Sequence, residues 1–512
     1  MGSNDNDNDP TGSTDKDPTG TDEVGRPAEA PNPLYTRIHT TEDPELSGED
    51  VDDYDDDFDE TGIDAGPRES RGVETRLVAA EVVGRVLDDG AYVQHALGAA
   101  LRRSSLGPRD RGFATELSYG TLTWLRPIDK ALERLLDRGI GSVYPDLLQL
   151  LRVGAYQLGW RKQEVPDFAV IHETVDAARS LRGRGKANFV NAILRSMQRD
   201  LEIVFNPPKK ATGAPKLGHT HSVPDWVAER LIGQLGEDDA MLALEAWNRP
   251  TPVHVRWREG LGMASESLTP HPTVPGAYIV DSGALHDLAE LHDGRVSVQD
   301  AGAQLAGWMA PTEGRALELC AGVGGKTKHL ADRLGEANIV ATDRDEKKLN
   351  KLMSELAVVR TLVWDAGNEP APGRLVEGER FDHVLVDAPC SGLGSIGRHP
   401  DTRWNRGPEV VAEMVAVQAR ILEAAAPMVV SGGTLLYVVC TWTNEEGPEQ
   451  VQRFLENHPN FKLEPPAGGG MMVGPNWSEL FESEGPRAGT ITLWPHTSST
   501  DGFFFARFRR VQ

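Results

Sequence analysis

The sequence predicts a multidomain protein: an acidic tail, an all-α domain, a small α+β domain and a C-terminal α/β domain. Three observations support this organisation. A chain of 512 residues is too long for a single hydrophobic core. Helical spacing of apolar residues marks the N-terminal half, whereas apolar strands alternate with helical stretches from Gln299 onward. Acidic residues are concentrated at the start of the chain.

The first segment is an acidic tail. Residues 1–70 hold 22 of the 78 acidic and 4 of the 53 basic residues, a net charge of -18, whereas the rest carries -7. The run "EDVDDYDDDFDE" repels itself and buries little apolar surface, so we expect disorder over residues 1–74. A solvated tail is the simplest interpretation, and an RNA-mimicking or autoinhibitory tail is the alternative. The overall charge therefore does not argue against an RNA partner.

Residues 75–200 predict an all-α domain. In "YPDLLQLLRVGAYQLGW" the side chains of Leu147, Leu151 and Leu158 share one helix face, and "KANFVNAILRSMQRD" repeats this spacing. Basic residues gather in two loops of this domain. They are interpreted either as a solvated face or as phosphate contacts, and those that we expect to bind RNA are Arg109, Arg111, Arg184 and Lys186.

Two shorter segments follow. Residues 201–222 are rich in Pro, Gly and Lys and predict a linker. Residues 223–298 predict a small α+β domain, with helices at "DWVAERLIGQLG" and "DAMLALEAWN" and strands at "PVHVRW" and "AYIVDS".

Residues 299–512 predict a parallel, doubly wound sheet with helices on both faces. The expected strands are "RALEL", "NIVATD", "TLVW", "DHVLVD", "TLLYVV" and "GFFFARF", with helical patterns between them. Ligands bind at the carboxyl ends of strands in such sheets. The residues that follow these strands are therefore the candidates for function.

The loop "CAGVGGKT" follows the first of these strands and suggests two kinds of ligand. The phosphate-binding loop of an NTPase needs glycine where Cys320 stands, and the dinucleotide fingerprint needs glycine where Thr327 stands. Asp343 ends the next strand, where a carboxylate binds ribose hydroxyls, and Asp365 would lie beside an adenine. The pattern thus favours a nucleoside-containing ligand, as in NAD or S-adenosylmethionine (SAM) sites.

Three cysteines, Cys320, Cys390 and Cys440, each follow an apolar run. They are too few for a disulfide framework and lack zinc spacing, so we expect no metal; buried structural cysteine is the alternative for each. Two thiols on adjacent strand ends suit methylation of cytosine at C5, because thiolate addition at C6 makes C5 nucleophilic. Asp387 would then hydrogen-bond the N3/N4 edge of the base.

The C-terminal region resembles the RNA cytosine-C5 methyltransferases of the RsmB/Sun family. The matching motifs are "SVQDAGAQLA", "LELCAGVGGKTKHL", "VATDRDEKKL", "VLVDAPCSGLGSIGRHPDTRW", "LLYVVCTWTNEE" and "DGFFFARF". The resemblance implies a Rossmann-like class I SAM methyltransferase in which Cys440 attacks C6 and Cys390 assists product release. The chain departs from the family at Gly322-Val323, where Ala-Pro is usual, and at Val439, where Thr or Ser is common.

The N-terminal domain resembles the NusB-like RNA-binding domain of the RsmB branch. The matching stretches are "RDRGFATELSYGTLTWLRPID", "LLRVGAYQLGW", "VPDFAVIHETVDAAR" and "ANFVNAILR". The two resemblances cover roughly residues 75–512 and imply an RNA target, either 16S rRNA or a small-subunit assembly intermediate. Lys326 then faces the SAM and cytosine site, and Arg403 is expected to contact RNA. The expected SAM-binding residues are Cys320, Ala321, Gly322, Val323, Gly324, Gly325, Lys326, Asp343, Arg344, Asp365 and Asp387.

Three other functions are compatible with parts of the sequence. They are a methyltransferase on tRNA or another RNA, an NTPase, and an RNA-binding ribosome-assembly factor whose site Val323 and Val439 have weakened. The chain has neither an apolar stretch of membrane-spanning length nor a secretory signal. We therefore expect a cytoplasmic monomer without a membrane partner.

Overall fold

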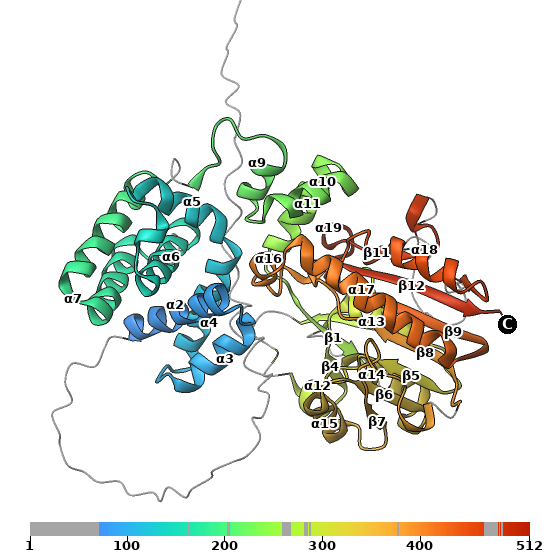
Figure 1. Cartoon of the computed structure of the whole chain (residues 1–512). Coiled ribbons are helices and arrows are strands. Elements are labelled where there is room, and N and C mark those ends of the chain that lie inside the picture. The colour runs from blue at the N-terminus through green and yellow to red at the C-terminus, as the bar shows by residue number, and fades with distance from the viewer. Residues whose placement is uncertain are drawn as a thin grey trace, which may run out of the picture.

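The computed structural model describes residues 71–161, 164–201, 205–258, 268–280, 285, 288–375, 378–464, 480, 482 and 485–511. Helices gather at the N-terminal side of the molecule and a large sheet forms the C-terminal side (Figure 1). The predicted tail lies outside the described residues except for residues 71–74, which belong to the first helix and not to a tail.

The all-α prediction for the N-terminal domain is confirmed. Its helices surround one apolar core, and α6 is buried along nearly its whole length. Gly183, with φ of 74°, kinks the long helix α7. The helices are α2 (Arg71–Asp89), α3 (Val93–Arg103), α4 (Pro108–Thr123), α5 (Leu125–Leu135), α6 (Pro145–Trp160) and α7 (Asp167–Arg199), with a 3-10 turn at Ile140–Ser142.

The predicted linker contains a helix that its Pro, Gly and Lys content did not indicate. Helix α9 (Gly213–Thr220) places Ala214 and Leu217 in a core shared with α10 (Asp225–Leu235) and α11 (Glu237–Asn248). The same core includes Trp442 and Trp494 of the C-terminal region. The helical part of the middle segment therefore packs against the C-terminal domain.

The rest of the middle segment forms an antiparallel sheet of order β2-β3-β1-β4. Its strands are β1 (Val253–Trp257), β2 (Leu268–Pro270), β3 (Ala277–Val280) and β4 (Val296–Val298), and α12 (Ala289–His292) precedes β4. The strands β1 and β3 match the prediction.

The C-terminal sheet has the order β10-β12-β9-β8-β5-β6-β7, with β11 paired to β12. The five strands from β9 to β7 are parallel as predicted, but β12 runs antiparallel to β9, β10 and β11, so the sheet is mixed. The strands are β5 (Ala316–Leu319), β6 (Ile339–Asp343), β7 (Arg360–Val363), β8 (Phe381–Asp387), β9 (Val429–Val439), β10 (Phe461–Leu463), β11 (Ile491–Leu493) and β12 (Phe503–Arg510).

Helices cover both faces of this sheet (Figure 1). Alternate residues of the central strands point to opposite cores: Val384 and Val386 pack toward α17 and α18, whereas Leu385 packs toward α13, α14 and α15. The helices are α13 (Ala301–Trp308), α14 (Gly325–Leu334), α15 (Glu346–Glu355), α16 (Thr402–Asn405), α17 (Pro408–Ala425), α18 (Pro448–Asn457) and α19 (Pro495–Ser498). Among the helices described, none is both long and apolar enough to cross a membrane.

Candidate active site

Two thiols meet where the central strands end. Strands β8 and β9 are parallel neighbours, so the segments that follow them lie side by side. The Sγ atoms of Cys390 and Cys440 are 3.2 Å apart, although 50 residues separate them in the chain. The hydrogen bond to Cys440 and burial raise the pKa of Cys390 well above its usual value. Cys390 is therefore a neutral thiol at physiological pH.

An ion pair lies beside the thiols. Lys326, in the first turn of α14, donates to Asp387 Oδ2 at the end of β8 over 2.7 Å. Burial alone would lower the pKa of Lys326, but the charge of Asp387, its hydrogen bond and the nearby Cys440 together raise it. Lys326 therefore stays protonated, and Cys440 lies near a charged pair that can donate and accept hydrogen bonds.

The Gly-rich turn between β5 and α14 adopts backbone angles that favour glycine. Gly322 and Gly324 have φ of 58° and 91°, and Cys320 has φ of 61°. A Cβ atom on Gly322 would meet no atom within 4 Å, so a ligand can approach the backbone there. Burial and nearby carboxylates raise the pKa of the Cys320 thiol far above its usual value. Cys320 is therefore not a nucleophile.

Asp343 is poised to bind hydroxyl groups. It is largely buried at the end of β6; Oδ2 accepts from the Gly322 N–H and Oδ1 from the Asp345 N–H, both over 2.9 Å. Each carboxylate oxygen has two acceptor sites, so one on each remains for a ligand. These acceptor sites and the open space at Gly322 fit an adenosyl group.

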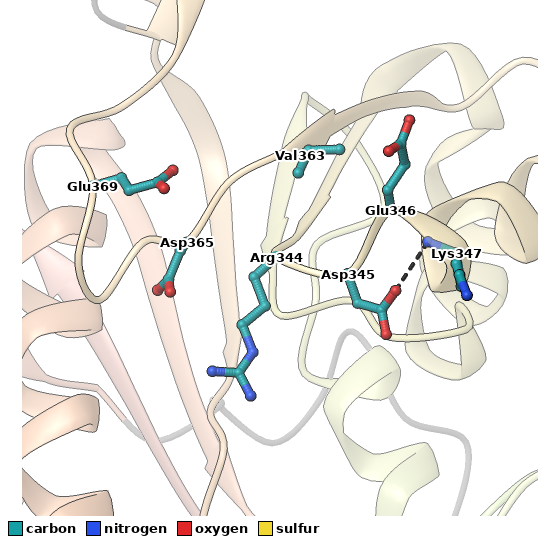
Figure 2. A pocket seen from close by; sticks show the side chains of 7 residues that line it. All are labelled: Arg344, Asp345, Glu346, Lys347, Val363, Asp365 and Glu369. Carbon is teal, nitrogen blue, oxygen red and sulfur yellow. Dashed lines mark hydrogen bonds between the residues drawn. The ribbon is translucent and has the colours of Figure 1, made fainter.

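A hollow of about 570 Å³ opens beside Asp343, where β6 and β7 end. In Figure 2 the side chain of Arg344 extends toward the side of the hollow where Asp365 lies. Asp345 instead caps α15 by accepting from the Lys347 N–H over 2.9 Å. The predicted residues Arg344 and Asp365 thus both line this hollow. The full lining consists of Arg344, Asp345, Glu346, Lys347, Val363, Asp365 and Glu369.

The residues predicted to bind RNA differ in their accessibility. Arg109, Arg184 and Lys186 are exposed. Arg111 is half-buried and donates to the Leu101 carbonyl over 2.6 Å at the end of α3. It therefore serves at least in part to hold the helices together.

The prediction for Arg403 is wrong. Its side chain is 1% exposed, and its guanidinium donates to the backbone carbonyls of Thr123 and Ser222 over 3.4 and 3.2 Å. The neighbouring Trp404 donates from Nε1 to the Leu122 carbonyl over 2.7 Å. Arg403 joins the all-α domain to the C-terminal domain and is not available to a phosphate.

Two buried carboxylates escaped the sequence analysis. Glu318 lies in β5 beneath the Gly-rich turn, and burial raises its pKa to about 8. Glu446 is fully buried beside Ser391, the residue after Cys390. An acidic residue inside the apolar run "RALEL" could have revealed Glu318, whereas no pattern in "CTWTNEE" shows which glutamate is buried.

Comparisons with known proteins cover both main domains. The model of the 16S rRNA methyltransferase RsmB/F family matches residues 306–509, and that of the NusB family matches residues 73–199. The chain is 31% identical to a probable ribosomal RNA small subunit methyltransferase B of Synechocystis, over 86% of this chain and 100% of that protein. It is 32% identical to ribosomal RNA small subunit methyltransferase B of Vibrio cholerae, over 76% and 91%.

A solved structure has the same overall fold. The crystal structure of PH0851 superposes with a TM-score of 0.67 and 24% identity, over 85% of this chain and 98% of that one.

Proposed function

Because this chain belongs to the RsmB family of ribosomal RNA small subunit methyltransferases, we propose that it methylates C5 of one cytosine in 16S rRNA. Membership makes it an RNA methyltransferase with a NusB-type helical domain. The base and the covalent route are our proposal, and one observation carries them. The Cys390 and Cys440 thiols lie 3.2 Å apart at adjacent strand ends.

The cofactor is proposed to be SAM. When bound, SAM supplies the electrophilic methyl group that C5 accepts. Asp343 would accept hydrogen bonds from the ribose hydroxyls, and Arg344 and Asp365 would border the adenosine. Gly322 leaves the backbone of the turn open to close approach. The remaining turn residues, Cys320, Ala321, Val323, Gly324 and Gly325, complete the proposed cradle.

The thiols are proposed to act in sequence on the base. Unmodified C5 is too poor a nucleophile, so the Cys440 thiolate adds to C6 and turns C5 into an enamine carbon. After C5 has gained its fourth substituent, a proton-accepting group (a general base) removes the C5 proton. The C6–S bond then breaks, the double bond re-forms and Cys440 leaves as thiolate. Cys390 is the thiol nearest to this elimination and is proposed to assist it.

The Lys326–Asp387 pair is proposed to hold the pyrimidine edge. Addition at C6 places electron density on N3 and the exocyclic amine, where a hydrogen-bonding partner lowers the barrier. Lys326 donates to Asp387 over 2.7 Å and keeps further N–H donors for N3, whereas Asp387 keeps acceptor sites for the N4 amine. The cytosine must leave its helix or loop to reach this pair, so we propose a flipped or unpaired target. We further propose that the enzyme works as a monomer in the cytoplasm.

Transfer of label tests this function directly. Unmethylated 16S rRNA from the 30S subunit is incubated with the protein and with SAM that carries a tritiated methyl group. The RNA is then digested and its nucleosides are separated. We expect label in 5-methylcytidine at a single position, which bisulfite mapping of rRNA from a deletion strain would locate. Label in N6-methyladenosine, or no transfer by the wild-type protein, would contradict the proposal.

A further inference from the structure

A buried carboxylate joins the segments that carry the two thiols. Glu446 Oε1 accepts from the Ser391 N–H over 2.7 Å and from Gln418 Nε2 over 3.0 Å. Glu446 Oε2 accepts from the hydroxyls of Ser391 and Thr443 over 2.5 and 2.9 Å. Four donors thus face the four acceptor sites of an ionised carboxylate. Ser391 directly follows Cys390, and Thr443 lies three residues after Cys440, so Glu446 bridges both thiol segments.

Further bonds make this bridge rigid. The Ser391 hydroxyl lies 3.0 Å from the Thr441 hydroxyl, and the Gly394 N–H donates to the Cys440 carbonyl over 3.0 Å. The Tyr437 hydroxyl donates to the Glu446 carbonyl over 2.8 Å, which ties Glu446 to strand β9. The side chains of Ser391, Thr441 and Thr443 are buried, so water does not compete for these bonds.

We propose that Glu446 is the positioning residue of the thiol pair: its carboxylate holds the Cys390 segment against the Cys440 segment so that both sulfur atoms face one base. This inference rests on the proposed cytosine chemistry. Glu446 acts through Ser391 and Thr443 and is not itself a catalytic residue. Removal of the carboxylate leaves buried donors unsatisfied on both segments and separates them.

The charge of Glu446 has a second effect. It adds to the hydrogen bond with Cys440 and to burial in raising the pKa of Cys390. The Gly392 backbone and Tyr437 also interact with Cys390, and Lys326 interacts with Cys440. Lys326 lies near Cys440, and the charge of Glu446 acts on Cys390. The two thiols therefore sit in different surroundings, as two different roles require.

A purely structural carboxylate would behave differently. A residue that only stabilises the fold lowers the unfolding temperature when it is replaced, without changing the reactivity of the folded fraction. A positioning residue changes kcat and the distance between the thiols, while the substrates still bind. The two cases are therefore separable in the full-length protein.

The test compares Glu446→Gln with Glu445→Gln. Glu445 is the neighbouring carboxylate, and it pairs with Arg230 over 2.8 Å in a partly exposed position. Thr443→Val is a milder change that removes one donor to Glu446. Two quantities are measured: kcat and KM for methyl transfer to 16S rRNA, and the rate at which diamide joins Cys390 to Cys440. Diamide takes one hydrogen from each thiol and becomes the hydrazine, and peptide mass spectrometry locates the disulfide.

We expect Glu446→Gln to lower kcat about tenfold or more while KM stays within about twofold. Disulfide formation should slow about tenfold, because the sulfur atoms must meet to react. Thr443→Val should shift both quantities in the same direction by less, and it decides the matter if Glu446→Gln does not fold. Glu445→Gln should match the wild type.

Two outcomes separate this inference from the proposed function. If Glu446→Gln and Thr443→Val keep wild-type kcat and disulfide rates and lose only thermal stability, the positioning role is overturned. If the wild type methylates no cytosine, the proposed function fails. The disulfide rates still report whether Glu446 sets the separation of the thiols, because diamide acts without RNA or SAM.

Discussion

At the scale of single residues, removal of each of the two thiols should affect the reaction differently. Cys440→Ala deletes the proposed nucleophile, so methyl transfer should fall by roughly a thousandfold or more. Cys390→Ala keeps the nucleophile but impairs its elimination, so a covalent protein–RNA adduct should accumulate. Denaturing gels with labelled RNA detect the adduct, which the wild type should not accumulate. If neither variant shows its effect, the assigned roles are wrong.

The raised pKa of Glu318 should make the free energy of unfolding depend on pH. Burial raises the pKa of Glu318 from 4.5 to about 8, so the folded state holds a proton that the unfolded state releases near pH 4.5. This contribution is fully present below pH 4.5 and is lost as the pH rises through 8. Glu318→Gln cannot ionise, so relative to the wild type it should gain about 4 kcal/mol between pH 5 and pH 8.5.

Urea unfolding at the two pH values measures this gain. Glu313→Gln replaces an exposed carboxylate just before the same strand and should show no such trend. An equal difference between Glu318→Gln and the wild type at both pH values would contradict the protonated state of Glu318.

Sequence reasoning found the cysteines because strand ends are readable from apolar runs. It misjudged Arg403, because a basic residue after a functional motif gives no sign of burial. The carbonyls that bind Arg403 belong to segments as far as 280 residues away in the chain. Glu446 was missed for the same reason: its partners Ser391 and Gln418 lie after β8 and on α17, which only the fold brings to the segment after β9.

At the scale of elements, the turn before α14 requires glycine at one position. Gly324 has φ of 91°, and a Cβ atom there would lie 2.9 Å from Leu352. Gly324→Ala should therefore cost about 1–3 kcal/mol of stability. Gly325→Ala is the matched control for stability, because its backbone is helical and a Cβ atom would meet nothing within 4 Å. Equal unfolding temperatures for the two variants would argue against strain at Gly324.

The elements that the sequence predicted are those with long apolar runs. The strands β5, β6, β8, β9 and β12 follow from such runs. Strands β2, β4, β10 and β11 have three residues each, which is too short for any periodicity to emerge. Helix α9 was hidden by its Pro and Gly content, and its helical state depends on packing with α10 and Trp247.

At the scale of the whole molecule, the contacts of Arg403 should make the domains unfold together. Its buried guanidinium satisfies backbone carbonyls of the all-α domain, the α9–α10 turn and α11. Arg403→Met should cost about 2–4 kcal/mol and split the thermal transition, because those carbonyls lose their donor. Calorimetry of the full chain would resolve the two transitions. Arg249→Met, at a mostly exposed arginine, should leave one transition; a single transition in both variants would contradict the coupling.

The domain organisation was predictable and the domain contacts were not. Composition and periodicity distinguish the all-helical region from the region in which strands and helices alternate. The family resemblance indicates which type of domain each region forms. The contacts of Arg403 and Trp404 with the all-α domain join residues that share no local pattern. The predicted limits 75–200, 223–298 and 299–512 stay proposals.

The antiparallel strand β12 sets the order in which the site can assemble during synthesis. Strand β9, which leads to Cys440, pairs with β8 on one edge and with β12 on the other. The ribosome adds β12 more than sixty residues after β9, so the nascent strand first has one open edge. Until β12 docks, the chain that bears Cys440 is held on one side only. A newly made molecule therefore acquires its complete thiol site late, after most of its length has left the ribosome that makes it.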